Sequence, residues 1–179
     1  MPDQLYCSVG SDNFSGGFQA TSHLIHKGCR QIAFLGDFKS GEAKFRFDGY
    51  CQALQTNSLA LRPELYIQSP YTPLEAQQAM HAFCDKGIQI DGLFAASDLI
   101  AINAMGVLNA RGLKVPDDIA VIGYDDVDAS RHSFPPLSTL RQPLDIAAKA
   151  LLESLQEVMR GGQPASRQLG SELVVRESA

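Results

Sequence analysis

The sequence predicts an α/β fold in which a parallel sheet lies between layers of helices. Apolar runs that suit buried strands alternate along the chain with longer amphipathic runs that suit helices, as is typical of parallel strands joined by crossover helices. In the run Val115–Asp126, a turn leads into an apolar strand that stops at the adjacent carboxylates Asp125 and Asp126. Ligands collect beyond the carboxyl ends of strands in open parallel sheets, so this run predicts the edge of a binding site.

The first part of the chain predicts a helix, a strand and a second helix. The first helix covers residues 14–27 and ends at Gly28, a natural helix stop, before a buried strand over residues 31–35. A second helix extends to about Asn57, because apolar residues recur at steps of four, three and four: Ala43, Phe47, Tyr50 and Leu54.

A capping box marks the start of the next helix. A strand over residues 65–68 precedes Thr72-Pro73-Leu74-Glu75, in which a threonine cap, a proline and a glutamate three residues after the cap favour a helix N-terminus. This helix ends at Gly87, before a strand over residues 92–96. Its inward face is predicted to contain Ala76, Ala79, Met80 and Phe83.

A further helix runs from Ser97 or Asp98 to Arg111. Its apolar face carries Ala101, Ala104, Met105 and Leu108. Leu99 and Ile102 are apolar but lie off that face. This excess of apolar surface predicts either a partner chain or a second lobe of the same chain as its cover.

The end of the chain predicts a loop, a connector, a helix and a strand. Residues 127–134 form a polar loop, and prolines keep residues 135–143 extended. Pro143 opens a helix to Arg160, and a strand over residues 172–176 follows. The inward face of that helix is predicted to be Ala147, Ala150, Leu151, Leu155 and Val158.

Composition narrows the classes of function. The 179 residues carry 15 basic and 20 acidic side chains and a net charge of -5, which disfavours direct nucleic-acid binding by this chain. The four cysteines form no CxxC pair, which favours free thiols in a reducing compartment. A membrane span and a secretion signal are both missing from the sequence, which predicts a cytoplasmic protein.

Neither catalysis nor metal binding is predicted. The histidines have no metal-ligand spacing, Ser133 and Ser138 lack a nucleophile elbow, and residues 36–41 do not satisfy a phosphate-binding loop. The pair Asp125 and Asp126 could hold a metal for phosphoryl chemistry. That chemistry also needs a further carboxylate and a lysine at other strand ends, and the sequence does not place them. We therefore expect no enzyme, no cofactor and no metal.

Several spaced motifs together carry a family resemblance. They are Asp12-Asn13 with Gly16-Gly17, His23-Leu24-Ile25 with Gly28, Arg46 with Gly49-Tyr50, Ser97-Asp98, the run 115–126 and the run 135–143. With these motifs the chain resembles the lactose-repressor and galactose-repressor family of bacterial transcription regulators. The resemblance implies a two-lobed effector-binding domain with the periplasmic-binding-protein fold, which holds a sugar, a sugar phosphate or a nucleobase between its lobes.

The resemblance also implies a division of the chain. Residues 29–142 and 168–179 form a nearly complete C-terminal lobe, and residues 1–28 and 143–167 form a partial N-terminal lobe. Family members also carry a DNA-binding helix-turn-helix and the first half of the N-terminal lobe, so the chain is expected to be truncated. An incomplete lobe leaves apolar surface uncovered, which predicts self-association, mobility or rearrangement.

The family implies partners as well. We expect a sugar-like effector, DNA bound only through a helix-turn-helix that this chain lacks, and a homodimer. Leu99, Ile102 and Ser133 are the expected interface positions. The alternative is a periplasmic sugar-binding protein of a transport system, which shares the fold but would carry a signal segment.

Two residues are the main binding candidates. The resemblance places a ligand-holding arginine at Arg46, and a guanidinium fork suits vicinal hydroxyls, phosphate or carboxylate. From the sequence alone, Arg46 could instead be a surface arginine in an ion pair. Asp125 is expected to accept hydrogen bonds from ligand hydroxyls, whereas Asp126 caps or braces the loop that follows.

Five further positions are secondary candidates. Ser97 either binds ligand or caps a helix, with Asp98 beside it as cap or brace. Tyr71 either stacks on a sugar face or packs the loop. Three positions could line the cleft from the crossover between lobes and from the N-terminal lobe: Gln142, Leu144 and Ser15.

Overall fold

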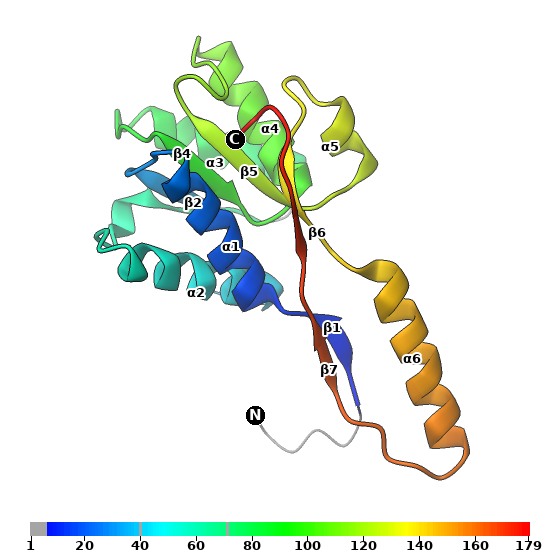
Figure 1. Ribbon diagram of the computed structural model, residues 1–179. Coiled ribbons are helices and arrows are strands. Elements are labelled where there is room, and N and C mark those ends of the chain that lie inside the picture. Colours follow the sequence, from blue (N-terminus) through cyan, green and yellow to red (C-terminus); the bar gives the residue numbers. More distant parts are fainter. Residues whose placement is uncertain (1–6, 40, 71) are drawn as a thin grey trace.

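The computed structural model describes residues 7–39, 41–70 and 72–179. Within them, six strands form one sheet in the order β3-β2-β4-β5-β6-β8 (Figure 1). All neighbouring strands are parallel except β8, which runs antiparallel to β6. The strands are β2 (Ile32–Gly36), β3 (Tyr66–Gln68), β4 (Gly92–Ala95), β5 (Ala120–Asp125), β6 (Ser138–Arg141) and β8 (Glu172–Val174).

Helices cover both faces of this sheet. They are α1 (Asn13–His26), α2 (Gly41–Thr56), α3 (Pro73–Cys84) and α4 (Asp98–Ala110). Alternation along β5 separates the layers, because Tyr124 lies against Gly16 of α1, whereas a Cβ added at Gly123 would meet Asp98 of α4. Helices α1 and α2 therefore form one layer, and α3 and α4 form the other. The predicted fold class is confirmed.

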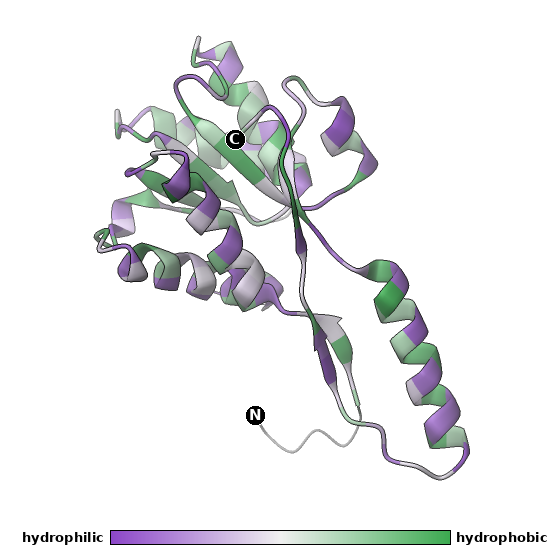
Figure 2. Cartoon of the chain, viewed as in Figure 1, coloured by the Kyte–Doolittle hydropathy of each residue, from purple (hydrophilic) through white to green (hydrophobic). Residues whose placement is uncertain are grey.

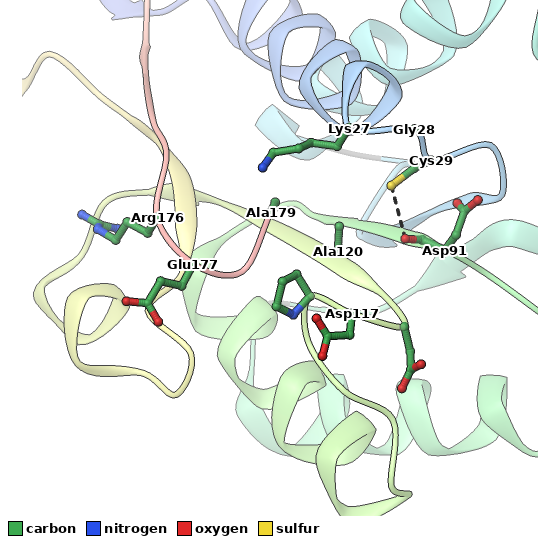
Figure 3. A pocket seen from close by; sticks show the side chains of 11 residues that line it. Lys27, Gly28, Cys29, Asp91, Asp117, Ala120, Arg176, Glu177 and Ala179 are labelled. Carbon is green, nitrogen blue, oxygen red and sulfur yellow. Dashed lines mark hydrogen bonds between the residues drawn. The ribbon is translucent and has the colours of Figure 1, made fainter.

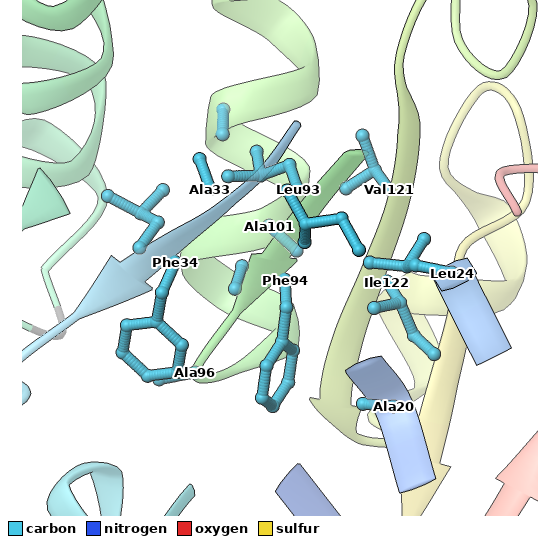
Figure 4. Close-up of a cluster of buried hydrophobic side chains, with 14 of the residues drawn as sticks. Ala20, Leu24, Ala33, Phe34, Leu93, Phe94, Ala96, Ala101, Val121 and Ile122 are labelled. Carbon is cyan, nitrogen blue, oxygen red and sulfur yellow. The ribbon is translucent and has the colours of Figure 1, made fainter. Parts of the chain in front are cut away.

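Aromatic and aliphatic side chains fill the space between the layers (Figure 4). The Phe34 ring lies 5.2 Å from Phe47, 5.6 Å from Tyr50 and 5.3 Å from Phe94, centroid to centroid. The Tyr50 hydroxyl donates to the carbonyl of Ile32 at 2.8 Å, so the phenol is buried with its polar atom satisfied.

The predicted helix boundaries follow local chemistry. Thr72 caps α3 by accepting a hydrogen bond from the backbone N–H of Glu75, which confirms the capping box. Gly28 follows α1 with a φ of +102°, a backbone conformation that favours glycine, which confirms the predicted stop. The polar loop predicted over residues 127–134 is wrong in part, because residues Asp128–His132 form a short helix, α5. A 3-10 turn, η1 (Pro63–Leu65), leads into β3.

A second part of the molecule extends away from the carboxyl edge of the sheet (Figure 1). It contains β1 (Val9–Ser11), α6 (Leu144–Met159) and β7 (Arg167–Leu169), and β1 pairs with β7 in parallel. We call residues 7–11 and 143–170 the arm and the remaining described residues the body. The strands β1 and β7 were not predicted, since both are short.

The predicted inward face of α6 is wrong in part, because Ala150 is buried but Leu151, Leu155 and Val158 are exposed. Only Ala150 and Ser154 of this helix are buried, and Figure 2 shows apolar positions repeating along its length. Nothing in the described chain covers the side of α6 that carries them. The exposed large apolar side chains of this helix are Leu144, Ile146, Leu151, Leu152, Leu155, Val158 and Met159.

Helix α1 belongs to the body by its packing. It lies along α2 and buries Ala20, Leu24 and Ile25 in the main core. Of the described residues 7–28, α1 therefore packs in the body, whereas β1 pairs with β7 of the arm.

Candidate functional site

Arg46 lies buried beside the carboxyl edge of the sheet. Only 4% of the residue is exposed. Its Nε donates to Asn13 Oδ1 at 2.8 Å and its NH1 to the carbonyl of Ala96 at 2.5 Å. The guanidinium carbon sits 3.7 Å from the centre of the Tyr124 ring, in cation–π geometry. The alternative of a surface arginine in an exposed ion pair does not hold.

Two glycines bring Arg46 to this place. A Cβ added at Gly17 would stand 2.0 Å from the carbonyl oxygen of Arg46, and one added at Gly49 would stand 2.1 Å from the carbonyl oxygen of Phe14. Helices α1 and α2 thus touch backbone to backbone where the two glycines meet. This contact sets Arg46 of α2 beside Asn13 in the first turn of α1.

Asp125 ends β5 next to this arginine and joins it to the arm. Its Oδ1 lies 3.7 Å from Arg46 NH1 and accepts from Gln142 Nε2 at 2.6 Å. The Oε1 of Gln142 accepts in turn from Ser11 Oγ at 2.7 Å. Burial raises the pKa of the Asp125 carboxyl, and the Arg46 charge and the Gln142 hydrogen bond oppose this rise. A polar chain therefore runs from arm to body through Gln142.

The backbone at the end of β5 is strained. Asp125 has a φ of +116° and Asp126 a φ of +56°, values that side chains other than glycine rarely adopt. Such strain concentrates at functional sites and persists where surrounding contacts hold it. Here the contacts of the two carboxylates supply that restraint.

Asp126 braces the loop that follows the strand. It accepts hydrogen bonds from Arg141 Nε at 2.6 Å and from Arg176. Burial alone would raise the pKa of this carboxyl, but the hydrogen bonds and charges of Arg176 and Arg141 hold it below its usual value. Its lone pairs are committed to β6 and the C-terminal segment, away from the Arg46 cluster.

Ser97 and Asp98 divide their tasks. The Ser97 hydroxyl is 5% exposed as a residue and has no hydrogen-bond partner in the described chain, and it makes no side-chain cap on α4. Asp98 accepts from the Val127 N–H at 2.9 Å and from Thr139 Oγ1 at 2.5 Å, so it braces the sheet. Its burial raises the pKa of the Asp98 carboxyl to about 6, although these hydrogen bonds lower it.

Other expected residues do not join the Arg46 cluster. Ser15 donates its N–H and its hydroxyl to Asp12, the cap of α1. Leu144 is exposed at the start of α6. Tyr71 lies outside the described residues. Ser133 donates to the carbonyls of Ser130 and Pro135 and so shapes its own loop.

Sequence reasoning missed several residues of the cluster. Asn13 orients Arg46, Tyr124 supports its guanidinium, and Ser11 holds Gln142. Asn13 belongs to the Asp12-Asn13 motif and Tyr124 directly precedes Asp125, so both could have been found from their positions in the motifs. Ser11 offered none, because its contact spans 131 residues of sequence.

A cavity of about 620 Å³ lies at the opposite, amino-terminal edge of the sheet (Figure 3). Its polar groups serve the fold. Cys29 Sγ donates to the carbonyl of Asp91, whose carboxylate accepts from the N–H groups of Arg30 and Gln31. Arg176, also on its wall, is paired with Asp126. This cavity is therefore not the site that the strand ends predict.

Two kinds of feature are absent from the described residues. No group of three or more histidine, cysteine or acidic side chains is arranged there to hold a metal ion. None of the described helices combines the length and the apolar character that crossing a membrane requires.

Comparison with known proteins gives the architecture a family. Residues 21–179 match the periplasmic binding protein-like domain. The chain belongs to this family. Within it, the chain is similar to the effector-binding domains of lactose-repressor-type transcription regulators, as the resemblance implied.

Two curated relatives of this domain are transcription regulators. The HTH-type transcriptional regulator CelR of Thermobifida fusca is 34% identical over 183 residues, which cover 99% of this chain and 53% of the relative. The HTH-type transcriptional repressor PurR of Histophilus somni is 34% identical over 175 residues, covering 95% and 52%. The chain thus spans about half the length of these relatives. Neither of them is named as an enzyme.

Two solved structures share the fold of this domain. A transcriptional regulator CelR–cellobiose complex superposes with a TM-score of 0.94 at 33% identity, covering all of this chain and 56% of that one. A dimeric Lac repressor with a C-terminal deletion gives a TM-score of 0.89 at 26% identity, covering 96% and 63%.

Proposed function

We propose that this domain binds a sugar-like effector at the Arg46–Asp125 cluster and serves as the effector-binding and dimerisation domain of a DNA-binding transcription regulator. The cluster offers both kinds of group that sugar hydroxyls need: guanidinium and amide donors in Arg46 and Gln142, and a carboxylate acceptor in Asp125. The CelR–cellobiose complex supports a sugar as the class of effector.

One observation carries the proposal. Gln142 lies where the chain leaves the body for the arm, and its amide bridges Asp125 of the body and Ser11 of the arm. A ligand that competes for Asp125 or Gln142 changes how arm and body are tied together. Allostery requires that the ligand bind two states of the protein with different affinities. Because the Gln142 amide bonds to both arm and body, ligand affinity would depend on how the two are joined.

The remaining candidates keep proposed roles around this centre. The unpartnered hydroxyl of Ser97 follows Ala96, whose carbonyl holds Arg46, so a ligand hydroxyl would satisfy it. Leu144 would supply apolar contact from the arm. Ser15 would act indirectly, because its hydroxyl donates to Asp12 at the start of α1.

We also propose that the body is one lobe of the effector-binding domain and that the arm belongs to a second lobe. The apolar side of α6 is uncovered, and a lobe built on the arm would cover it. The boundary then falls near residue 12, with α1 in the body, rather than at residue 28.

A homodimer would form over the start of α4. Leu99 is exposed there and Ile102 is half-buried, and Phe134, which lies beside Met105 and Asn109 farther along α4, is 96% exposed. Ser133 contributes by shaping the loop that presents Phe134. The dimeric Lac repressor supports this assembly.

Light scattering tests the dimer. At micromolar concentration it should give twice the mass of one chain, and Leu99→Asp with Phe134→Asp should halve that mass. A single-chain mass for the unaltered protein would exclude the dimer.

The effector proposal is tested by thermal shift on the full-length protein with a panel of monosaccharides, disaccharides and sugar phosphates. A ligand raises the melting temperature by mass action. Arg46→Ala should abolish the shift, and Arg46→Lys, which keeps the charge but loses the fork, should reduce it.

Arg111→Ala is the control, because Arg111 pairs with Asp85 on the surface and is remote from Arg46. A shift that survives Arg46→Ala in a folded protein removes Arg46 from the binding set. A purine that stabilises the protein when no sugar does would replace the sugar with a nucleobase.

A further inference from the structure

A small recess opens beside the Arg46–Asp125 cluster, between the starts of α1 and α2. Its volume is about 130 Å³. Asn13, which holds Arg46, forms part of its wall, and so do the exposed rings of Phe14 and Phe45 and the carboxylate of Glu42. The recess therefore adjoins the cluster at Asn13, the residue that the two share.

Glu42 shares a helix face with Arg46. The two residues are four positions apart on α2, so their side chains lie one turn from each other. The charge of Glu42 reaches Asp125, whose pKa it helps to raise, after the larger effect of burial. Glu42 thus adds a second negative charge to the site that Asp125 already makes acidic.

Among the described residues, Arg46 is the only cation in direct contact with Asp125. Part of its hydrogen-bonding capacity is already used. Arg46 gives Nε to Asn13 and NH1 to the carbonyl of Ala96, and its face is stacked on Tyr124. Asp12, a third carboxylate, also lines the recess. An anionic ligand would face three carboxylates and one guanidinium, two of whose N–H donors are already used within the protein.

We propose that the recess is an outer part of the effector site, in which Glu42 makes the site select an uncharged sugar over its phosphorylated form. This inference rests on the proposed function and narrows the class of effector. Sugar hydroxyls can donate to Glu42 and Asp125, whereas a phosphate group dianion has no proton to donate and is repelled. The rings of Phe14 and Phe45 give the apolar wall that a sugar ring needs.

The test uses matched pairs of neutral and charged ligands. Glucose, cellobiose and trehalose are compared with their 6-phosphates by thermal shift and titration calorimetry on the full-length protein at low ionic strength. The neutral member of a responding pair should bind about tenfold more tightly or better, and Glu42→Gln should cut that preference about threefold. Glu64→Gln removes the same charge from an exposed position beside β3 and should leave the preference unchanged.

A phosphorylated sugar that binds the unaltered protein as tightly as its neutral partner overturns the inference, and so does a preference that Glu42→Gln leaves intact. If no pair responds, inorganic phosphate decides: protection of Glu42→Arg but not of the unaltered protein supports the inference, and any other pattern overturns it. A phosphorylated sugar that binds as tightly as its neutral partner, and whose binding Arg46→Ala abolishes, would leave the effector proposal standing while removing the charge selection.

Discussion

The body and the arm contain the same kinds of element, yet they bury their apolar residues to very different degrees. In the body, Phe34, Phe94 and Ile122 are fully enclosed between two helix layers. In the arm, α6 has an equally clear apolar side, but its leucines are half exposed. An amphipathic pattern defines a surface that needs a cover, and it does not say whether the same stretch of chain supplies one.

The difference also assigns tasks to the two regions. The body holds Arg46 and Asp125 by buried contacts within the body. The arm reaches them through Gln142, through the Asn13 amide, which donates to the carbonyl of Ser11 at 3.3 Å, and through the backbone of Asp12, which donates to the carbonyl of Leu169 at 2.8 Å. A rigid half of a site joined to a lightly attached half suits a ligand-operated switch.

Truncation of one large side chain in each region should have very different costs. Phe94→Ala should cost about 3–5 kcal/mol of unfolding free energy, because the ring is 0% exposed and leaves a cavity. Leu155→Ala, at a residue 56% exposed, should change it by under about 0.5 kcal/mol in this 179-residue chain. Urea unfolding of both variants measures the two costs, and equal losses would mean that α6 is packed in solution.

An added methyl group should also affect the two regions differently. Gly17→Ala in the body should destabilise by about 3 kcal/mol, at the upper end for overpacking, because the new Cβ would meet the Arg46 carbonyl at 2.0 Å. Gly10→Ala in the arm is its control, since nothing lies within 4 Å of the added carbon. Thermal unfolding reports both. A Gly17→Ala protein as stable as the Gly10→Ala protein would disprove the close contact of α1 and α2.

What the sequence could predict follows this division. The body elements have strong local signals, such as the Thr72 capping box, the stop at Gly28 and the buried strand before Asp125, and these were predicted to within a few residues. Strands β1 and β7 have three residues each and pair across more than 150 positions, so no local pattern announces them. The face of α6 was predicted to point inward because periodicity cannot distinguish a covered side from an uncovered one.

The site was predictable where motifs carried it. Arg46 and Asp125 came from the family resemblance and meet in the structure at 3.7 Å. Ser97 was left between two roles, and the choice depended on whether its hydroxyl bonds to the helix end, which only coordinates reveal. Glu42 has the ordinary features of a first-turn acid, so its position beside Asp125 could not be read from its neighbours in sequence.

The pH dependence of stability should reside in the body. Burial raises the pKa of Asp98 from its ordinary value of 3.8 to about 6 in the folded chain, so between these pH values the folded state keeps a proton that the unfolded state releases. The stabilisation from this retained proton is fully present below about pH 4. It is lost as pH rises to about 6, a change of roughly 2–3 kcal/mol in the free energy of unfolding.

Asp98→Asn should reduce this slope to the smaller part that the raised pKa of Asp125 contributes, as measured by urea unfolding at pH 4, 5, 6 and 7. The depressed pKa of Asp126 acts in the opposite sense, because its contribution is lost only as pH falls below its ordinary value of 3.8. An unchanged slope between pH 4 and 6 in Asp98→Asn would rule out Asp98 as the titrating group.

The smallest effect is expected from a charge pair in the arm. Arg167 of β7 donates to Glu153 of α6 at 2.9 Å, and both side chains are largely exposed. Exposed pairs contribute about 0.2–1 kcal/mol and are screened by salt, so Glu153→Gln should lower stability by no more than that, and 0.5 M salt should erase the difference. Lys44 and Asp48 form an exposed pair in the body, and Asp48→Asn is the matched control. If Glu153→Gln instead reduces stability by several times the cost of Asp48→Asn, the pair is shielded from solvent and the arm is as firmly packed as the body.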